Sequence, residues 1–420
     1  MNPLGADRGI LTRSPSPAGY PDAPNMNRRH FLSLLTVSSA GMSLSRASFP
    51  VDRKFRVAVI GHTGRGNYGH GEDAVWLKIP EAEIVGLADA DPKGLEAEQK
   101  KLRLEKGYAD YREMLSEVKP DIVTIAPRFV DEHREMTLAA IAAGALGIYM
   151  EKPFCRSPEE ADELVAAAEA KGVKISIAHR NRFHPVLPVV RKLIQDGTIG
   201  KALEMRARGK EDKRGGAQDL WVLGAHLLNL ACYFGGEPVA CSAAIFQDGR
   251  LAAPADVREG DEGVGLLSGN EVHARYELEH GLPLFFDSVA NAGTRESGFG
   301  LQVIGTKGII DFRLDEEPLA HLLGGNPFRP RADAALWQPI TTAGIGLPEP
   351  IPNLGPQVSG HVLAVRDLMA AIREDRAPLC DAWAGRTTVE MICAVFESHR
   401  LGGRRVTFPL RTRKNPFALS

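Results

Sequence analysis

The stretch from Phe55 to Gly71, FRVAVIGHTGRGNYGHG, constrains the fold of this chain more than any other. It begins with four consecutive apolar residues, 57–60, as in a strand that is buried on both faces of a parallel sheet. Several glycines follow, and then a segment at 73–78 for which we expect a helix. A strand that leads through glycines into a helix presents free backbone N–H groups, which together with the helix dipole favour an anion such as a pyrophosphate.

The match to the dinucleotide-binding pattern G-x-G-x-x-G is incomplete. Gly61 and Gly66 fit it, but Thr63 occupies the middle glycine position, and Gly64 stands one residue later. We expect Gly64 to allow the close approach of a phosphate in its place. The alternative is an ordinary glycine-rich loop. The candidate cofactor-binding residues here are Gly61, Thr63, Gly64, Arg65 and Gly66.

An acidic residue closes the next expected strand. Residues 83–89 are mostly apolar and end in Asp89, which lies further from Gly61 than the roughly twenty residues usual for this pattern. A carboxylate at this place accepts hydrogen bonds from a ribose diol and repels a 2′-phosphate. We therefore expect NAD as the cofactor in preference to NADP. A solvated strand end is the alternative for Asp89.

Strands and helices alternate from residue 54 to about residue 178. This alternation predicts an α/β fold, with a Rossmann dinucleotide-binding domain over 54–178 whose ligands bind at the C-terminal ends of the parallel strands. After Asp89, the expected strands lie at 121–126, 147–150 and 173–178, and the expected helices at 92–106, 133–143 and 158–171.

The strand at 147–150 leads directly into Glu151, Lys152 and Pro153. A lysine at the C-terminal end of a strand would lie over a bound dinucleotide, with its ammonium group near a substrate hydroxyl. Partial desolvation lowers the pKa of a lysine, so that it can help to move a proton. A surface Lys-Pro turn is the alternative interpretation.

With this motif the chain resembles the Gfo/Idh/MocA oxidoreductases, which include glucose–fructose oxidoreductase and inositol dehydrogenase. The resemblance covers about residues 54–410 and implies that Lys152 is the acid–base lysine and that Pro153 is a cis proline beneath the nicotinamide. It also implies cofactor-binding roles for Pro127, His133 and Glu151. The matching segments are the glycine loop, Asp89, 127–144, 151–153, 181–185, 305–308 and 396–406.

Polar and cationic residues follow the last expected Rossmann strand, at 179–185. Such groups at a strand end suit a polyol, and we take Asn181 and Arg182 as candidate substrate-binding residues. Each could equally be a solvated linker residue. A helix over 186–196 follows, ending before Gly197.

The resembled family places an aspartate four residues before a histidine on one helix, where the two side chains share a face. Here His226 stands at the histidine position, but Val222 replaces the aspartate, and a further family aspartate is Asn229. Asp219 lies about two helical turns before His226 and is our candidate for the missing carboxylate. His226 has a near-neutral pKa and is the candidate general base. The alternative for His226 is a histidine in the core, and the alternative for Asp219 is a helix N-cap.

Residues 179–410 are expected to form an α+β domain that binds the substrate. Short alternating segments from residue 237 onward predict a large, mostly antiparallel open sheet. The resemblance implies that this sheet mediates homo-oligomer contacts, with Phe285, Phe286 and Val303 as face residues. Residues 324–357 read as a long loop, and helices over 358–374 and 387–400 are expected to pack back against the first domain.

The chain before residue 54 has the composition of a disordered segment followed by an export signal. Residues 1–25 are rich in Pro, Gly, Asp and Ser, and Met26 is an alternative start. Residues 26–47 contain a paired arginine, Arg28-Arg29, a modest apolar stretch and a small-x-small cleavage site, which resembles a twin-arginine signal. We expect a periplasmic or other extracytoplasmic protein without stable membrane insertion.

Composition excludes some classes of partner. The chain has 51 basic and 53 acidic residues, so no basic surplus points to nucleic acid. Its 5 cysteines show no metal-type spacing, and we expect buried thiols, no disulfide framework and no metal site.

Three functions remain open. The first is NAD-dependent oxidation or reduction at a secondary hydroxyl of a sugar, cyclitol or related polyol. The second is a glycoside hydrolase or lyase in which retained NAD transiently oxidises the sugar, a variant that the resembled family includes. The third is a cofactor-binding protein without turnover, suggested by Val222 and Asn229. The sequence favours the first.

Overall fold

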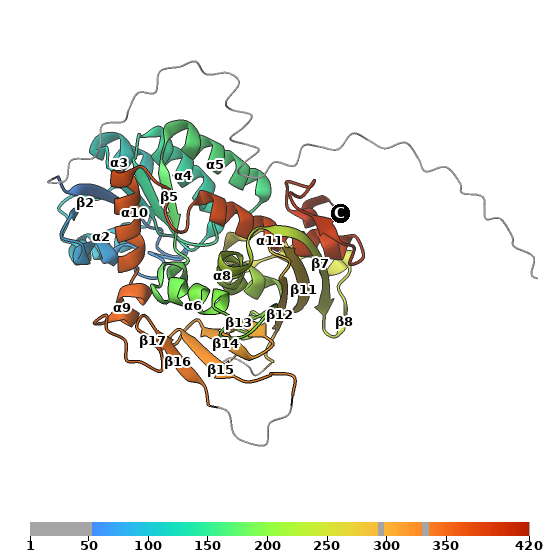
Figure 1. Cartoon of the computed structure of the whole chain (residues 1–420). Coiled ribbons are helices and arrows are strands. Elements are labelled where there is room, and N and C mark those ends of the chain that lie inside the picture. Colours follow the sequence, from blue (N-terminus) through green and yellow to red (C-terminus); the bar gives the residue numbers. More distant parts are fainter. Residues whose placement is uncertain (1–52, 293–297, 330–335, 420) are drawn as a thin grey trace, which may run out of the picture. The chain divides into compact units, whose positions relative to one another are not determined.

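The structure, a computed structural model, describes residues 53–292, 298–329 and 336–419. Within them the chain forms a five-stranded parallel sheet, a larger sheet in the second half, and a two-stranded ribbon (Figure 1). The predicted fold class, a Rossmann sheet followed by an α+β half with a large, mostly antiparallel sheet, is confirmed. The expected disordered segment 1–25 and the expected signal 26–47 lie outside the described residues.

The parallel sheet has the strand order β2-β1-β3-β4-β5. Strand β1, which lies between β2 and β3, begins with Phe55, and residues 57–60 are at most 1 % exposed, because helices or loops cover both faces of the strand. The strands are β1 (Phe55–Ile60), β2 (Ala82–Ala88), β3 (Ile122–Ile125), β4 (Gly147–Met150) and β5 (Lys174–Ile177).

The helices between these strands begin and end at recognisable signals. Ser157 caps α5 (Pro158–Lys171) by accepting from the Glu160 N–H at 3.2 Å, and Gly172 ends it with φ 63°. Helix α2 (Pro92–Leu102) is shorter than predicted, because Arg103 adopts the left-handed conformation with φ 58°. The other helices of this half are α3 (Tyr111–Val118) and α4 (His133–Ala142).

The segment directly after the glycine loop differs from the helix predicted there. The chain forms turns over 63–73 and then a 3₁₀ helix, η1 (Ala74–Lys78), of 5 residues. A 3₁₀ helix this short has no developed macrodipole. In the described residues, no α-helix begins directly after the glycine loop, so the predicted anion site at an α-helix N-terminus is absent there.

The larger sheet has the order β17-β16-β15-β14-β13-β6-β12-β11-β7-β18, with β8 beside β7. Only its β6–β12 pair is parallel among the pairs that the structure describes. Its strands are β6 (Ala202–Arg208), β7 (Pro238–Gln247), β8 (Arg250–Leu251), β11 (Glu271–Leu278), β12 (Pro283–Val289), β13 (Gly300–Gly305), β14 (Gly308–Arg313), β15 (Ala320–Gly324), β16 (Gln338–Thr341), β17 (Gly344–Ile345) and β18 (Val406–Thr407), and the ribbon pairs β9 (Arg258–Glu259) with β10 (Leu266–Leu267).

Helices α8 (Ala225–Gly235) and α11 (Ala382–Arg400) pack on one face of this sheet. Phe286 and Val303, predicted as face residues of the sheet that would mediate oligomer contacts, are fully buried in this chain. The prediction missed the alternation along each strand, which turns these two side chains toward the helices. Phe285 does lie on the other face, where the Arg206 guanidinium is 5.1 Å from its ring centroid.

The chain returns to the first sheet near its end, as predicted. Helix α10 (Val362–Glu374) packs on β4 and β5, and α11 contacts α5 and β5 as well as β7 (Figure 1). Asp381 caps α11 by accepting from the Ala384 N–H at 2.9 Å, so the helix begins earlier than predicted. The expected loop at 324–357 contains β16, β17 and a short helix, α9 (Leu354–Ser359).

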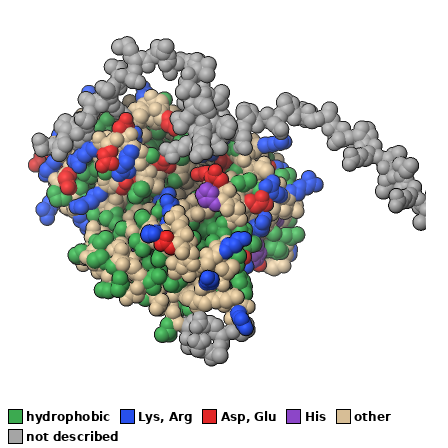
Figure 2. All heavy atoms as spheres, viewed as in Figure 1, with side chains coloured by type: hydrophobic (Ala, Val, Ile, Leu, Met, Phe, Trp, Pro, Cys, Tyr) green, Lys and Arg blue, Asp and Glu red, His purple; other side chains and the backbone are tan. Residues whose placement is uncertain are grey.

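All 5 cysteines are free thiols, and 4 of them are buried. Acidic and basic side chains are interspersed over the face of the molecule shown in Figure 2. In the part of the chain that the structure describes, no helix has the length and apolar character needed to cross a membrane.

Candidate active site

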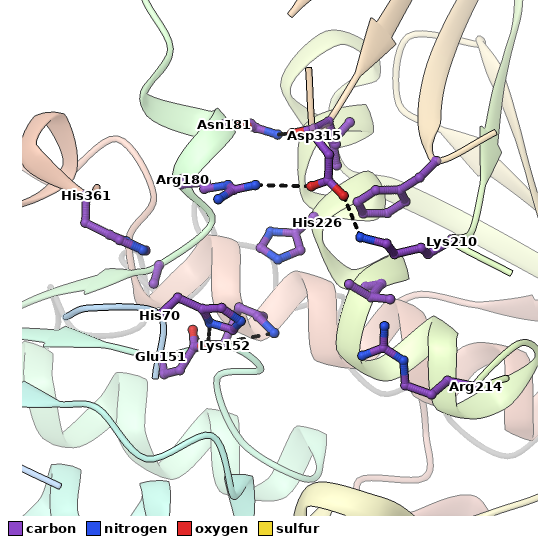
Figure 3. A pocket seen from close by; sticks show the side chains of 14 residues that line it. His70, Glu151, Lys152, Arg180, Asn181, Lys210, Arg214, His226, Asp315 and His361 are labelled. Atoms are coloured by element: carbon purple, nitrogen blue, oxygen red, sulfur yellow. Dashed lines mark hydrogen bonds and ion pairs between the residues drawn. The ribbon is translucent and has the colours of Figure 1, made fainter. Parts of the chain in front are cut away.

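A pocket of about 240 Å³ opens at the C-terminal ends of β4 and β5, where they face α8 (Figure 3). This is the edge at which ligands bind to parallel sheets of this kind. Four of the predicted site residues line it: Glu151, Lys152, Asn181 and His226. The sequence thus identified side chains from both halves of the chain that meet in one cavity.

Lys152 follows β4 and is buried against α8. Its Nζ donates a hydrogen bond to the carbonyl oxygen of Val222 at 3.1 Å and lies 3.8 Å from Glu151 Oε1. The Lys152–Pro153 peptide bond is cis, as the resemblance implied. Lys152 therefore enters the pocket with its ammonium group held by a main-chain oxygen and a nearby carboxylate.

The Val222 carbonyl is available because the helix changes its hydrogen-bonding pattern there. Between α7 (Ala217–Asp219) and α8 lies a π-helical turn, η4 (Leu220–Gly224). A switch from i+4 to i+5 bonding leaves a carbonyl for another donor, and such turns are frequent at functional sites. The position at which the resembled family has an aspartate thus still contacts Lys152, through its backbone.

His226 lies on α8 and faces a second histidine that follows β5. The Nδ1 atoms of His179 and His226 are 3.1 Å apart, and the two rings meet edge to face. Burial, followed by the influence of His179 and Lys152, holds the pKa of His226 well below its usual range. Burial likewise lowers the pKa of His179 to about 3. Both rings are therefore neutral at physiological pH, so His226 is able to accept a proton.

Asp219 does not orient His226, contrary to the prediction. Its Oδ2 accepts hydrogen bonds from Ser288 Oγ at 2.6 Å and from the Glu211 N–H at 3.2 Å, away from the pocket lining. The five-residue π turn between Asp219 and His226 has fewer degrees of rotation per residue than an α-helix. The two side chains consequently lose the common face that regular α-helical spacing would give them.

Asp89 lies at the predicted strand end, but its carboxylate is already engaged by the glycine loop. It accepts from the Thr63 N–H, from Thr63 Oγ1 at 2.7 Å, from Tyr68 Oη at 2.8 Å and from the Asp91 N–H at 2.9 Å. A carboxylate has about four acceptor sites. The expected role as a direct acceptor for a ribose diol is therefore not what the structure shows: Asp89 anchors the loop.

The glycine loop retains features that fit a phosphate group. Gly64 has φ 85°, and a side chain placed there would meet nothing within 4 Å. Gly66 is needed for packing, because a Cβ there would lie 2.4 Å from the Arg128 backbone nitrogen. Among the described residues, Arg128 Nε is buried without a hydrogen-bond partner, whereas Arg65 lies over the Phe129 ring and is paired with both Asp131 and Glu132. One guanidinium nitrogen near the loop, Arg128 Nε, is therefore available to an anion.

Two further predicted residues contact protein groups outside the pocket. His133 is fully buried, with Nδ1 2.8 Å from the Pro153 carbonyl oxygen and Nε2 2.7 Å from that of Pro127, so it links the ends of β3 and β4. Arg182 packs over the ring of Tyr233, 4.2 Å from its centroid. Neither lines the cavity, because partners distant in the sequence hold both side chains elsewhere.

An ion-pair network forms the opposite wall, and the sequence did not identify it. Asp315 accepts from Arg180 at 3.1 Å and from Lys210 at 2.6 Å (Figure 3). Arg180 stood in the polar segment at 179–185, but nothing in the sequence connects that segment to the β14–β15 turn. The other polar lining residues that the sequence missed are His70, Arg214 and His361.

Both halves of the chain match the profiles of known protein domains. Residues 55–179 match the profile of an oxidoreductase family with an NAD-binding Rossmann fold, and residues 191–408 match the C-terminal alpha/beta domain of that family. The chain belongs to the Gfo/Idh/MocA family. The resemblance drawn from the sequence motifs is thereby confirmed.

Relatives in the Gfo/Idh/MocA family include sugar dehydrogenases. D-apiose dehydrogenase of Paraburkholderia graminis is 31% identical over 215 residues, which span 49% of this chain and 56% of that protein. Levoglucosan dehydrogenase of Pseudarthrobacter phenanthrenivorans is 26% identical over 310 residues, spanning 64% of this chain and 78% of that protein. The first match thus covers little more than half of its relative's length.

A solved structure of levoglucosan dehydrogenase in complex with NADH and levoglucosan has the same fold. It superimposes with a TM-score of 0.67 over 85% of this chain and 100% of that chain, at 21% sequence identity.

Proposed function

We propose that the protein is an NAD-dependent dehydrogenase that acts on a secondary hydroxyl of a sugar, cyclitol or related polyol. The observation that carries this proposal is the meeting of Lys152 and His226 in one pocket of a Gfo/Idh/MocA fold. The names of the related proteins, which are dehydrogenases of apiose and levoglucosan, support the substrate class.

The two residues have complementary roles in oxidising an alcohol. The ammonium group of Lys152 stabilises negative charge on the substrate oxygen, while neutral His226 takes the hydroxyl proton through Nε2, because its Nδ1 faces His179. A bound nicotinamide supplies the hydride acceptor for the carbon. The hydroxyl proton would thus pass to His226 Nε2, and the hydride would pass from the carbon to a nicotinamide held beside Lys152, which would leave the substrate as a ketone.

We propose NAD rather than NADP as the preferred cofactor. Arg128 Nε and the unobstructed Gly64 fit a pyrophosphate. The Asp89 carboxylate stands at the strand end where a 2′-phosphate would approach, and it adds negative charge there even while it holds Thr63 and Tyr68.

The test is turnover of a panel of sugars and cyclitols with NAD⁺, with NADH measured optically and the ketone by mass spectrometry. A positioned acid–base group contributes about 10²–10⁴-fold to the rate. We expect Lys152→Ala and His226→Ala each to lower kcat by that factor while calorimetry shows unchanged NAD binding. Asp219→Asn is the matched control: its carboxylate lies outside the pocket, so kcat should stay within a few-fold of wild type.

Other outcomes would contradict the proposal. Cleavage of a glycoside without net NADH would favour the hydrolase or lyase alternative. Bound NAD without any product would favour a protein without turnover. Wild-type kcat in His226→Ala would remove the assigned base.

We also propose that the protein acts outside the cytoplasm and forms a homo-oligomer through the larger sheet. The twin-arginine-like segment at 26–47 supports the first part. The second rests on the face that carries Phe285 and ion pairs such as His273–Asp287, which α8 and α11 leave uncovered. Light scattering should show a mass that is a multiple of the monomer's, and Phe285→Glu should reduce it; a monomeric wild type would contradict this.

A further inference from the structure

Two glutamates and two histidines gather at the end of the pocket near the parallel sheet. His70 and Glu72 come from the loop before η1, Glu151 follows β4, and His361 precedes α10. One potential ligand atom from each of His70, Glu72 and Glu151 lies within 4.8 Å of the other two. His361 Nε2 is 3.7 Å from Glu72 Oε1. Figure 3 shows His70, Glu151 and His361 at the same end of the cavity.

Glu72 lacks compensation for its buried charge. Its side chain is 0 % exposed, Oε2 accepts from the His70 backbone N–H at 2.5 Å, and Oε1 has no hydrogen-bond partner among the described residues. Lys152, the nearest ammonium group to Glu151, donates its hydrogen bond to Val222. A buried carboxylate without a partner carries a large free-energy cost, which a cation in this position would relieve.

His361 has a free nitrogen that faces the same place. Its side chain is 2 % exposed, and in the part of the chain that the structure describes Nε2 has no hydrogen-bond partner. Its Nδ1 is 2.5 Å from Tyr149 Oη, which fixes the ring. With Nδ1–H donated to the phenol oxygen, the Nε2 lone pair points toward Glu72. Histidine ligands of metals commonly have their other nitrogen held in this way.

We propose that His70, Glu72, Glu151 and His361 bind a divalent transition-metal ion such as Zn²⁺ or Mn²⁺. Imidazole nitrogen and carboxylate oxygen are ligands that these ions accept, and two carboxylates match the charge of a dication. Tetrahedral bonds of about 2.0–2.2 Å put ligand atoms about 3.3 Å apart. The observed separations of 2.6 Å for His70 Nδ1–Glu151 Oε1 and 3.7 Å for His361–Glu72 lie on either side of that value, so small side-chain shifts suffice.

A ligand from the pocket would be a fifth ligand, because four protein ligands fill the tetrahedral positions. His70, Glu151 and His361 line the cavity, whereas Glu72 closes the site from the buried side. Zinc sites can expand to five-coordinate. In this protein a fifth ligand would occupy the same space as Lys152 and His226, where it could be a substrate hydroxyl. Metal binding does not depend on the proposed dehydrogenase activity and is measured separately from it.

The experiment uses tag-free full-length protein, freed of metal with a chelator and titrated with Co²⁺. We expect one ion per chain, with the visible absorption bands of cobalt bound to nitrogen and oxygen, and competition by Zn²⁺. Glu72→Gln should weaken Co²⁺ binding by more than about 100-fold, since even the loss of an outer-shell partner costs about 10–100-fold. His361→Asn should act in the same direction, and it preserves folding because asparagine tolerates the left-handed conformation that His361 adopts, with φ 62°.

Glu98→Gln is the matched control. Glu98 is also a buried glutamate beside a second carboxylate, Asp73, but this pair already has the ammonium group of Lys101, at 3.0 Å from Glu98. We expect its Co²⁺ affinity to equal that of wild type. Absence of stoichiometric binding by wild type, or equal binding by Glu72→Gln, would overturn the proposal. An infrared carbonyl band of a protonated acid that disappears in Glu72→Gln, without metal uptake, would show that a proton neutralises the site.

Discussion

At the scale of single residues, the side-chain hydrogen bonds of the acid–base pair are made with groups other than carboxylates. Lys152 is held mainly by the Val222 carbonyl, and His226 by the ring of His179. For His226 Nε2 to accept a proton, its Nδ1 must carry the hydrogen and donate it to His179. The neutral state of both rings makes this tautomer available. His179 is therefore a positioning residue for the base.

This arrangement predicts a change in the pH profile of His179→Ala. Burial and the neighbouring His179 both lower the pKa of His226, so losing His179 and admitting water should raise it. A base with a higher pKa becomes protonated at higher pH. The acidic limb of kcat/KM against pH should therefore move to higher pH.

Arg182→Ala is the control for this measurement. Arg182 lies close to His179 in sequence but packs over Tyr233 outside the pocket, so its removal should leave the acidic limb in place. A shift in Arg182→Ala equal to that in His179→Ala would mean that general loosening, and not the histidine pair, moves the profile.

The sequence predicted some of these residues and misassigned others for a physical reason. Lys152 and His226 were identified because a strand end or a helix position fixes where each lies. Asp219 and Arg182 were misassigned because their partners, Ser288 and Tyr233, come from segments that sequence spacing does not connect to them. The sequence around a residue indicates the chemistry of its side chain, but it does not identify a hydrogen-bond partner from a distant segment.

At the scale of secondary-structure elements, the π turn η4 sets the relation between Lys152 and His226. It supplies the Val222 carbonyl and begins α8 at the register that turns His226 to the pocket. Gly224 ends this turn against β12: a Cβ there would lie 2.8 Å from two ring atoms of Phe286. The turn therefore packs closely on the larger sheet because residue 224 has no side chain.

Gly224→Ala should consequently destabilise the protein and lower its kcat. Overpacking costs about 1–3 kcal/mol, and the roughly 1 kcal/mol that alanine gains over glycine in a helix offsets part of this cost. We expect a net loss of up to about 2 kcal/mol in the free energy of unfolding, measured with urea. A displaced α8 should also lower kcat, by up to about 100-fold for a shift of 1 Å.

Two further variants make this test specific. Combining Gly224→Ala with Phe286→Leu should restore part of the lost stability and part of the lost kcat, because the smaller leucine leaves room for the methyl group added at position 224. Gly324→Ala, where a Cβ would meet nothing within 4 Å, should behave like wild type. Full stability in Gly224→Ala alone would show that the helix tolerates the extra methyl group and that its register is not set here.

Elements with local signals were predictable, and those shaped by distant contacts were not. The ends of α5 were predicted to the residue, since Ser157-Pro158 and Gly172 mark them. The helix after the glycine loop was not, because Asp89, Tyr68 and Glu72 draw the loop into turns. The π turn has no marker in composition, and only packing against β12 reveals it.

At the scale of the whole molecule, the pocket is assembled from segments far apart in the chain. His70, Lys152, His226, Asp315 and His361 meet only when α10 packs on the parallel sheet and the β14–β15 turn reaches Arg180. The sequence predicted the edge of the sheet where this happens, but not the contributions of Asp315 and His361. A site assembled in this way exists only in the fully folded chain.

The proposed export route follows the same requirement, since a twin-arginine system carries proteins that have already folded. The cytoplasm supplies NAD, and a folded protein can take up its cofactor there before export. Fusing residues 26–50 to a reporter that folds before transport should direct it to the periplasm, and Arg28→Lys with Arg29→Lys should retain it in the cytoplasm. The full-length protein should distribute in the same way, and its periplasmic fraction should contain NAD. A reporter that stays cytoplasmic with both arginines intact would contradict the proposed location.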